Sequence, residues 1–475
     1  MKTKLALAVI ALGTLVACES DQEQARPTQI TAENIKDLKV PANFNFATTR
    51  NVEFNINVNG LKGQALSNKR VNFFTADPDQ GGELLASTYT NALGEANTSV
   101  LVPAYQRDLF VQVNASGFAN SERVQVSNKV SLNFGGKPVG RNFKKGKAAQ
   151  SGVIPAGGKY YYMGTFSTGS NAGLPNYLEP VGDNLSQQFL DDVDASLPER
   201  YDVPNNNPQY LASGNELDVV LSKKSDVWVT FVAEGAGYRN ALGYYVFDTD
   251  NPPATVNDID SVFIVLPNAS LANSNGALNA GDKVKLGTFE GGKTISWVLF
   301  QNAWNGSGVN LSKPKYYSRS AFNNESDASK KQHTVQLADI GRQLLLNGFE
   351  DLTRSSGSDD DFNDLIFYVT ANPWEAMDIT NVPPTTPKDD DDNDGISNES
   401  DDFPNDPSRA VTNNYTGTLA FEDLWPSEGD YDFNDMVVDY SIDQVLNGAN
   451  KVVEISADWT VRAVGATFAN GFGFT

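Results

Sequence analysis

The sequence contains very little of the two residues that bind soft metals and act as bases near neutral pH. Among 475 residues there is one cysteine, Cys18, and one histidine, His333. A disulfide framework and a cysteine- or histidine-rich zinc site are therefore excluded, and a Ser-His-Asp triad has little scope. His333 follows Lys330, Lys331 and Gln332, so we expect it to be a solvated loop residue.

Positive charge is also in short supply. The chain has 36 Lys and Arg residues against 59 Asp and Glu, which gives a formal net charge of −23. This charge argues against binding to nucleic acid or to anionic lipid head groups, and it suits divalent cations. We therefore expect no nucleic-acid partner.

The hydrophobic run at residues 5–17 is too short to cross a bilayer. As a helix it would reach roughly 20 Å, whereas the hydrocarbon core is about 30 Å thick. The run follows Lys2 and Lys4 and ends just before Cys18, as in a secretory signal peptide. Cleavage there would remove both lysines and change the formal charge from −23 to −25.

The end of this run, Leu15-Val16-Ala17-Cys18, resembles a lipobox. The resemblance implies that Cys18 becomes the acylated N-terminus and that lipid anchors the protein to its membrane. We expect an outer-membrane lipoprotein that is periplasmic or surface-exposed. A plain signal peptide with an incidental cysteine is the alternative.

The length of the chain allows two to four domains. Residues 51–59 alternate strictly between apolar and polar, which predicts a strand with one buried face. Turn residues separate further short strands, at 71–74, 99–102, 109–113 and 124–126, at the spacing of a small immunoglobulin-like or transthyretin-like β-sandwich. A turn at residues 91–95 and a strand ending in Pro103 resemble carboxypeptidase-regulatory or immunoglobulin-like modules, which usually act as spacers.

Further along the chain we expect strands at 227–233, 243–247, 262–266, 295–300 and 365–369, and a short helix at 185–193. The predicted fold is mainly β, with the small sandwich followed by two related, jelly-roll-like β-sandwich domains, the last incomplete. The predicted division is a signal peptide (1–17), lipidated cysteine and tether (18–42), small β-sandwich (43–134), linker (135–158), first acidic-repeat domain (159–373), linker with a calcium loop (374–411) and second acidic-repeat domain (412–475).

Two motifs recur and relate the last two domains. Phe-Glu-Asp-Leu at 349–352, followed by Asp-Asp-Asp-Phe-Asn-Asp at 359–364, returns as Phe-Glu-Asp-Leu at 421–424 and Asp-Tyr-Asp-Phe-Asn-Asp at 430–435. A glycine motif also returns with identical offsets, at Gly235, Ala236, Asn240 and Gly243 and at Gly465, Ala466, Asn470 and Gly473. Repetition predicts two related domains. Because the two motifs come in opposite order, we expect the second copy to be permuted or differently connected.

The segment between the two copies has the spacing of a calcium loop. Counted from Asp390, oxygen-bearing side chains fall at positions 1, 3, 5, 9 and 12, glycine is at position 6, and Ile396 at position 7 offers its carbonyl. Calcium prefers six to eight oxygen ligands, and glycine allows the sharp turn. The side chains are Asp390, Asp392, Asp394, Asn398 and Asp401. A solvated acidic linker is the alternative.

No amphipathic helices flank this loop, and position 12 is Asp401 where an EF-hand has Glu. The segment resembles a single thrombospondin type 3 repeat. We expect a calcium affinity of about 10⁻⁴ to 10⁻³ M, as in extracellular modules, and a joint between domains that calcium stiffens.

The acidic repeats are a second group of candidate calcium ligands. Alternation would place three oxygens of each copy on one side of an extended strand. The candidates are Glu350, Asp351, Asp359, Asp361, Asn363 and Asp364, and Glu422, Asp423, Asp430, Asp432, Asn434 and Asp435. In the alternative interpretation, Asp364 and Asp435 end a turn and bind backbone amides, while Phe362 and Phe433 fill the core.

Together with residues 176–180 and 228–240, these repeats resemble the LruC-domain family of bacterial envelope lipoproteins over about residues 176–475. The resemblance implies an outer-membrane or surface location and supplies no catalytic residues. The leading hypothesis is a calcium-stabilised envelope lipoprotein with a binding, adhesion or structural role, without catalysis, whose protein or glycan ligand is unknown. The rivals are a carboxylate-dependent glycan-active enzyme and a glycan-binding module that uses exposed Trp304, Trp374 or Trp425.

Overall fold

The structure, a computed structural model, describes residues 47–136, 153–235, 237–386, 388–392, 394, 396–398, 401–424, 430, 432–466 and 468–473. The predicted signal peptide, Cys18, the tether and most of the predicted first linker lie outside these residues. In the described part the chain is mainly β, with five separate sheets. None of its described helices has the length and hydrophobicity needed to span a bilayer.

The first sandwich is made of two sheets that enclose one core. Phe54 of one sheet and Phe73 of the other lie with ring centroids 4.6 Å apart, in a cluster of buried apolar side chains drawn from both sheets. The first sheet has the order β4(Glu95–Pro103), β1(Thr49–Asn59), β7(Lys129–Gly135); the second has β3(Leu84–Tyr89), β2(Arg70–Phe74), β5(Asp108–Val113), β6(Ser121–Gln125). All five strands predicted in this region are confirmed.

The second sandwich is larger and packs a seven-stranded sheet on a five-stranded one. Trp297 and Phe367, from opposite sheets, meet edge to face at 4.9 Å in the shared core. The larger sheet contains β8(Ile154–Gly157), β9(Tyr160–Tyr162), β10(Val219–Leu221), β12(Ala241–Asp248), β13(Val262–Leu266), β15(Lys293–Phe300) and β16(Lys315–Tyr317). The smaller has the order β14(Lys283–Phe289), β11(Ser225–Ala233), β19(Leu365–Asn372), β18(Leu344–Phe349), β17(Thr334–Asp339).

A short helix, α1(Gln187–Ser196), covers the outer face of the five-stranded sheet, as its apolar spacing predicts. Ser186 caps it by accepting a hydrogen bond from Phe189 N at 3.1 Å. The same helix faces the first sandwich, where Lys69 lies 3.0 Å from both Asp191 and Asp194. The remaining described helical segments are α2(Val203–Asn206), η2(Pro78–Gln80), η3(Pro208–Leu211), η4(Val256–Asp258), η5(Ser320–Phe322), η6(Ala328–Lys330) and η7(Trp374–Ala376).

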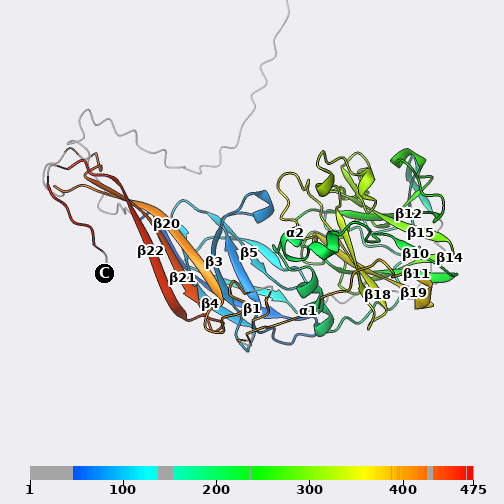
Figure 1. Cartoon of the computed structure of the whole chain (residues 1–475), viewed down its shortest axis with the longest axis horizontal. Helices are drawn as coiled ribbons and strands as arrows, with labels where there is room; N and C mark the ends of the chain where they lie inside the picture. The colour runs from blue at the N-terminus through cyan, green and yellow to red at the C-terminus, as the bar shows by residue number, and fades with distance from the viewer. Residues whose placement is uncertain are drawn as a thin grey trace, which may run out of the picture.

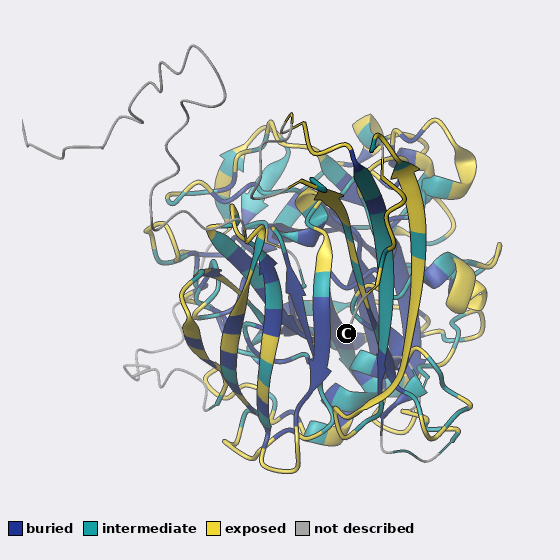
Figure 2. Cartoon of the chain, turned by 90° about the vertical axis from the view of Figure 1, so that its left-hand side faces the viewer, coloured by how far each residue is buried: buried dark blue, intermediate teal, exposed yellow. Residues whose placement is uncertain are grey.

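The third sheet has three antiparallel strands, β20(Val411–Phe421), β21(Met436–Leu446) and β22(Val452–Ala463). It lies against β3 of the first sandwich, so the first sandwich is in the middle, with the third sheet on one side and the second sandwich on the other (Figure 1). Most of β22 is exposed (Figure 2). In the part of the chain that the structure describes, no further sheet accompanies these three strands.

Strand order explains why the two repeated motifs come in opposite order along the chain. In the second sandwich the acidic motif joins β18 to β19, and β11, which precedes the glycine motif, pairs with β19. In the third sheet the acidic motif joins β20 to β21, and β22, which precedes the second glycine motif, pairs with β21. The spatial orders β18-β19-β11 and β20-β21-β22 are therefore the same, and only the connection differs.

Candidate metal sites

The loop at residues 390–401 brings its first three predicted ligands together. Asp390, Asp392 and Asp394 each offer a carboxylate oxygen, and these oxygens all lie within 4.8 Å of one another. Two of the three also hold the turn, since Asp392 accepts from Asp394 N at 3.2 Å and Asp394 accepts from Ile396 N at 2.7 Å. Their second carboxylate oxygens are buried and have no hydrogen-bond partner.

Asp401, at position 12, is close enough to Asp392 and Asp394 for their charges to act on its carboxylate. Its side chain is 8% exposed, one oxygen accepts from Phe403 N at 2.7 Å, and the other has no partner. Burial, with the charges of Asp394 and Asp392, raises the pKa of Asp401 to about 7. A buried oxygen without a partner is unfavourable, and a hard cation would satisfy it.

Asn398 and Ile396 contribute to the loop in different ways: the first by a hydrogen bond and the second by burying its side chain. Asn398 Oδ1 accepts from Asp391 N at 2.9 Å and so closes the turn. The Ile396 side chain is buried with Tyr89, Val411 and Leu446. Those three residues belong to the first sandwich and the third sheet, so the loop sits where these two parts meet.

This position differs from the one expected from chain order, which placed the loop between the second and third domains. Arg70 of β2 forms an ion pair with Asp402 at 2.8 Å, directly after the loop. The loop therefore lies at the contact between the first sandwich and the third sheet, because the chain returns across the first sandwich after leaving the second.

The acidic motif of the second sandwich forms a buried turn. Asp351 N donates to Asp364 at 2.7 Å, and Asn363 N donates to Asp361 at 3.1 Å. Phe362 between them has a positive φ of 61° and is fully buried. The predicted extended strand is thus wrong here, since left-handed residues cannot continue a strand.

The motif of the third sheet repeats the same hydrogen bonds. Asp423 N donates to Asp435 at 2.9 Å, Asn434 N donates to Asp432 at 3.2 Å, and Phe433 has a φ of 54°. Phe433 is 42% exposed. The alternative interpretation from the sequence is therefore right for Asp435 as a backbone acceptor and wrong for Phe433 as a core residue.

The glycine motif fits directly against each acidic turn. Gly235 N donates to Asn363 O at 3.1 Å, and Gly465 N donates to Asn434 O at 2.9 Å. A Cβ atom at either glycine would collide with the Oδ1 atom of the same asparagine. Close approach therefore requires glycine at both positions.

Carboxylates of the first turn are buried side by side. Burial and the charge of Asp359 raise the pKa of Glu350 to about 8, and burial is the main cause that raises the pKa of Asp351 to about 7. Burial also raises the pKa values of Asp361 and Asp364 well above the ordinary aspartate value. Like charges this close favour a bound cation or protons.

Each copy contains groups of carboxylates with the spacing of a metal site. In the second sandwich the group is Glu199, Asp359 and Asp361. In the third sheet the two groups are Glu422, Asp423 and Asp435, and Glu422, Asp430 and Asp432. Glu199 was not predicted from the sequence, because it lies outside the repeated motif, in the segment between α1 and α2, where no local pattern marks it.

His333 is fully buried. The prediction that it is a solvated loop residue is therefore wrong. Its ring stacks on Tyr316 with centroids 4.0 Å apart, Nδ1 lies 3.1 Å from Glu350 O, and Nε2 lies 3.3 Å from Glu325. Burial lowers the pKa of His333. The polar residues before His333 suggested a solvent-exposed position, but its side chain packs into the second sandwich.

Of the three tryptophans proposed for glycan binding, neither of the two that the structure describes is exposed. Trp304 is 2% exposed, and its Nε1 donates to Gly169 O and Ser170 O. Trp374 packs partly buried against the core of the second sandwich, and Trp425 lies outside the described residues. The burial of Trp304 therefore weakens the rival hypothesis of a glycan-binding module that uses exposed tryptophans.

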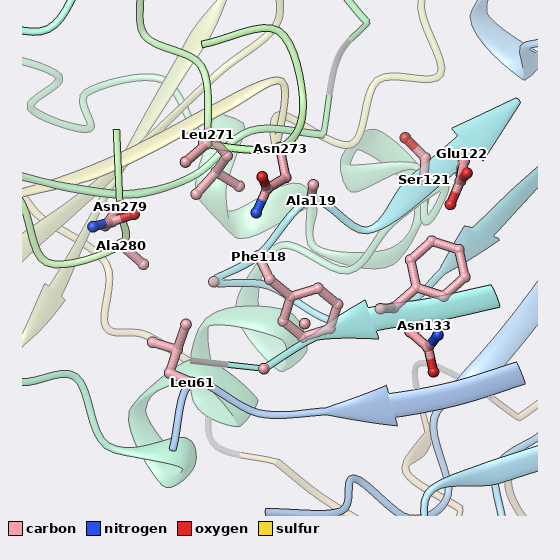
Figure 3. Close-up of a pocket in the computed structure, with 15 residues that line it drawn as sticks. Leu61, Phe118, Ala119, Ser121, Glu122, Asn133, Leu271, Asn273, Asn279 and Ala280 are labelled. Atoms are coloured by element: carbon pink, nitrogen blue, oxygen red, sulfur yellow. The ribbon is translucent and has the colours of Figure 1, made fainter. Parts of the chain in front are cut away.

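A cavity of about 380 Å³ lies between the two sandwiches (Figure 3). Phe118 and Asn133 line it from the first sandwich, and Leu271 and Asn279 line it from the second. Glu122 is the one acidic residue of its lining, so this cavity is not a candidate cation site.

Comparisons with known proteins match two regions of the chain to families without an assigned function. Residues 50–135 match a domain of unknown function (DUF8469), and residues 289–372 match another domain of unknown function (DUF4114). The first match spans the first sandwich, and the second ends with β19 and includes the first acidic turn. A search of curated proteins finds no match.

Two solved structures share low similarity with the chain. A shaft pilin, SpaA, from Lactobacillus rhamnosus GG is 8% identical over 53% of this chain and 87% of its own, with a TM-score of 0.14. A 9R-lipoxygenase from Cyanothece is 10% identical over 59% of this chain and 44% of its own, with a TM-score of 0.13.

Proposed function

We propose that the protein is a calcium-stabilised lipoprotein of the bacterial envelope, anchored through acylated Cys18, with a binding, adhesion or structural role and no catalysis. In this proposal the loop at 390–401 acts as a thrombospondin type 3-like calcium site, and the repeat domains belong with LruC-type modules. The location is the outer membrane, facing the periplasm or the cell surface, and the ligand is a protein or a glycan.

The observation that carries the proposal is the unpartnered buried oxygen of Asp401. It shares the loop with the convergent carboxylates of Asp390, Asp392 and Asp394. Four carboxylates and a backbone carbonyl approach the oxygen ligand number that calcium prefers, and solvent would complete the shell. Bound calcium would offset the repulsion within this loop and hold Ile396 in its buried site.

Calorimetric titration of calcium into the chelator-treated chain from residue 19 onward tests the site. We expect saturable calcium binding that is reduced in the Asp392→Ala/Asp394→Ala variant. The matched control, Asp250→Ala/Asp260→Ala, removes two exposed carboxylates elsewhere and should bind as the wild type does. If the loop variant bound calcium as the wild type does, residues 389–406 would be an acidic linker without a calcium site.

Acyl labelling of the expressed precursor tests the anchor. Radioactive or alkyne-tagged fatty acid should label the wild type and leave the Cys18→Ala precursor unlabelled. Labelling that survives the substitution would contradict the proposed anchor.

A further inference from the structure

A groove of about 490 Å³ opens on the outer face of the five-stranded sheet, beside the N-terminal end of α1. Side chains of β11, β14 and β19 form its floor, and these include Trp228 and Lys283. The segment that leads into α1 and the turn between β17 and β18 form its walls. Neither Trp304 nor Trp374 lines it. The groove thus stands on ordered strands, and its size lies within the usual range of ligand sites, about 300–1,000 Å³.

Trp228 of β11 brings a partly buried aromatic ring to this groove. Its Nε1 donates to Glu179 at 3.3 Å, which fixes the ring. The ammonium groups of Lys283 and Lys285 lie 5.5 and 5.2 Å from the ring centroid, and both lysines belong to β14, which pairs with β11 on one side. On the other side β19 pairs with β11, with Thr370 opposite Trp228. The lysines therefore cover the ring from the β14 side, and the β19 side borders the groove.

The charged side chains of the groove are already paired within the protein. Lys283 lies 3.0 Å from Asp183, and Arg342 lies 2.6 Å from both Asp192 and Asp339. An ion pair compensates each of these charges, so none of them needs a counter-ion from a ligand. The groove therefore favours a neutral ligand over a free ion.

Side-chain amides supply the hydrogen-bonding groups of the groove. Asn184 lies before α1, Gln343 lies in the turn between β17 and β18, and Asn372 ends β19. All three side chains are exposed. Because an amide both donates and accepts hydrogen bonds, these residues match a ligand that is rich in hydroxyl groups, which also do both.

We propose that this groove binds a neutral oligosaccharide of β-1,4-linked, gluco-configured units, with one pyranose ring stacked on the β19 side of Trp228. The hydroxyl groups of such a sugar are equatorial, so its C–H groups form flat faces that pack on an aromatic ring. The hydroxyl groups would bind the amides of Asn184, Gln343 and Asn372. This inference rests on the proposed binding role and names the class of ligand. It depends neither on calcium nor on acylation of Cys18.

Calorimetric titration of the chain from residue 19 onward, with cellotetraose and with chitotetraose as separate probes, tests the site. The probes share the flat β-1,4-linked chain, and chitotetraose alone carries acetamido groups, so they identify which sugar the groove accepts. We expect saturable binding of at least one. Trp228→Ala should weaken that binding about tenfold or more, whereas Trp228→Phe keeps a ring and should stay within about threefold of the wild type. Binding of neither probe, or unchanged binding in Trp228→Ala, would overturn the proposal.

Gln343→Gly provides a second test that spares the fold. Gln343 has a φ of 57°, which glycine adopts without strain, so the substitution removes the amide and keeps the turn. It should weaken binding of the accepted sugar about threefold or more. Asn273→Gly is the matched control, because Asn273 has a φ of 71° and lies outside the groove.

The Asn273→Gly control should bind the sugar as the wild type does, and equal binding in a folded Gln343→Gly variant would contradict the site. Calcium titration of the same variants separates this proposal from the calcium loop, since both should bind calcium as the wild type does. A chain that binds the sugar and no calcium would refute the loop and leave the groove standing.

Discussion

Asn413 in β20 holds the backbone of Ser87 in β3 with both ends of its amide. Its Oδ1 accepts from Ser87 N at 2.7 Å, and its Nδ2 donates to Ser87 O at 3.3 Å. Asn450 does the same to Tyr89, at 2.9 Å and 2.7 Å. Since β3 is an edge strand, these amides satisfy backbone groups that an edge leaves open. Side chains thus join the third sheet to the first sandwich.

Removing these amides should loosen that contact. We expect Asn413→Ala and Asn450→Ala each to lower the free energy of unfolding by about 1–3 kcal/mol, because each leaves a buried or half-buried backbone group without its partner. Urea unfolding followed by intrinsic fluorescence measures the change. Asn414→Ala is the matched control, because its side chain is exposed on the same strand, and it should cost about 0.5 kcal/mol or less. Equal losses in the three variants would contradict the role of the two amides.

Lys69 should be essential to the contact between the two sandwiches. Its ammonium lies 3.0 Å from both Asp191 and Asp194 of α1, in a largely buried position. Lys69→Met would leave two carboxylates without their counter-ion and should cost about 3–5 kcal/mol of stability. Lys62→Met, at an exposed position of the same sandwich, is the control and should be nearly neutral. A chemical-denaturation midpoint for Lys69→Met that matches the control would count against this prediction.

Asp218 should make the stability of the fold depend on pH. This residue lies apart from the candidate metal sites. It is 3% exposed, accepts from Ser318 Oγ at 2.5 Å, and burial raises its pKa from 3.8 to about 6. Because the folded pKa is the higher one, the folded state binds the proton more tightly. Its contribution to stability is therefore lost as pH rises from about 4 to about 6, and the loss reaches about 3 kcal/mol.

Asp218→Asn should remove that loss, because asparagine keeps an acceptor for Ser318 and carries no charge. The stability of the variant relative to the wild type, measured by urea unfolding in chelator between pH 4 and pH 8, should rise with pH and level off near pH 7. A difference that stays constant across this range would mean that Asp218 keeps an ordinary pKa in the fold.

Local patterns in the sequence were enough to predict many of the elements. The alternation at residues 51–59 became β1, because one face of that strand packs in the sandwich core. The spacing of Leu185, Phe189 and Val193 predicted a helix at 185–193, and α1 forms there from Gln187 onward. Phe189 and Val193 lie in its buried face, and Leu185 packs into the same cluster just before the helix. The repeated motifs also adopt matching turns, since the same hydrogen bonds recur in both copies.

Contacts between residues far apart in the chain were not accessible from local patterns. His333 follows polar residues, but its burial depends on Tyr316 and Glu325, which another part of the fold supplies. No local pattern predicts that Asp79 lies near Asp359, because their proximity depends on how the two sandwiches pack against each other. For the same reason the loop at 390–401 could be identified by spacing, whereas its position beside Tyr89 could not.

The most direct test of the calcium loop as a fastening between the first sandwich and the third sheet is differential scanning calorimetry of the chain from residue 19 onward. The wild type is compared in calcium and in chelator, beside Asp392→Ala/Asp394→Ala and the control Asp250→Ala/Asp260→Ala. We predict that calcium raises an unfolding temperature of the wild type and the control by several degrees, and that this shift is lost or reduced in the loop variant. An equal calcium shift in the loop variant, or none in the wild type, would contradict the account.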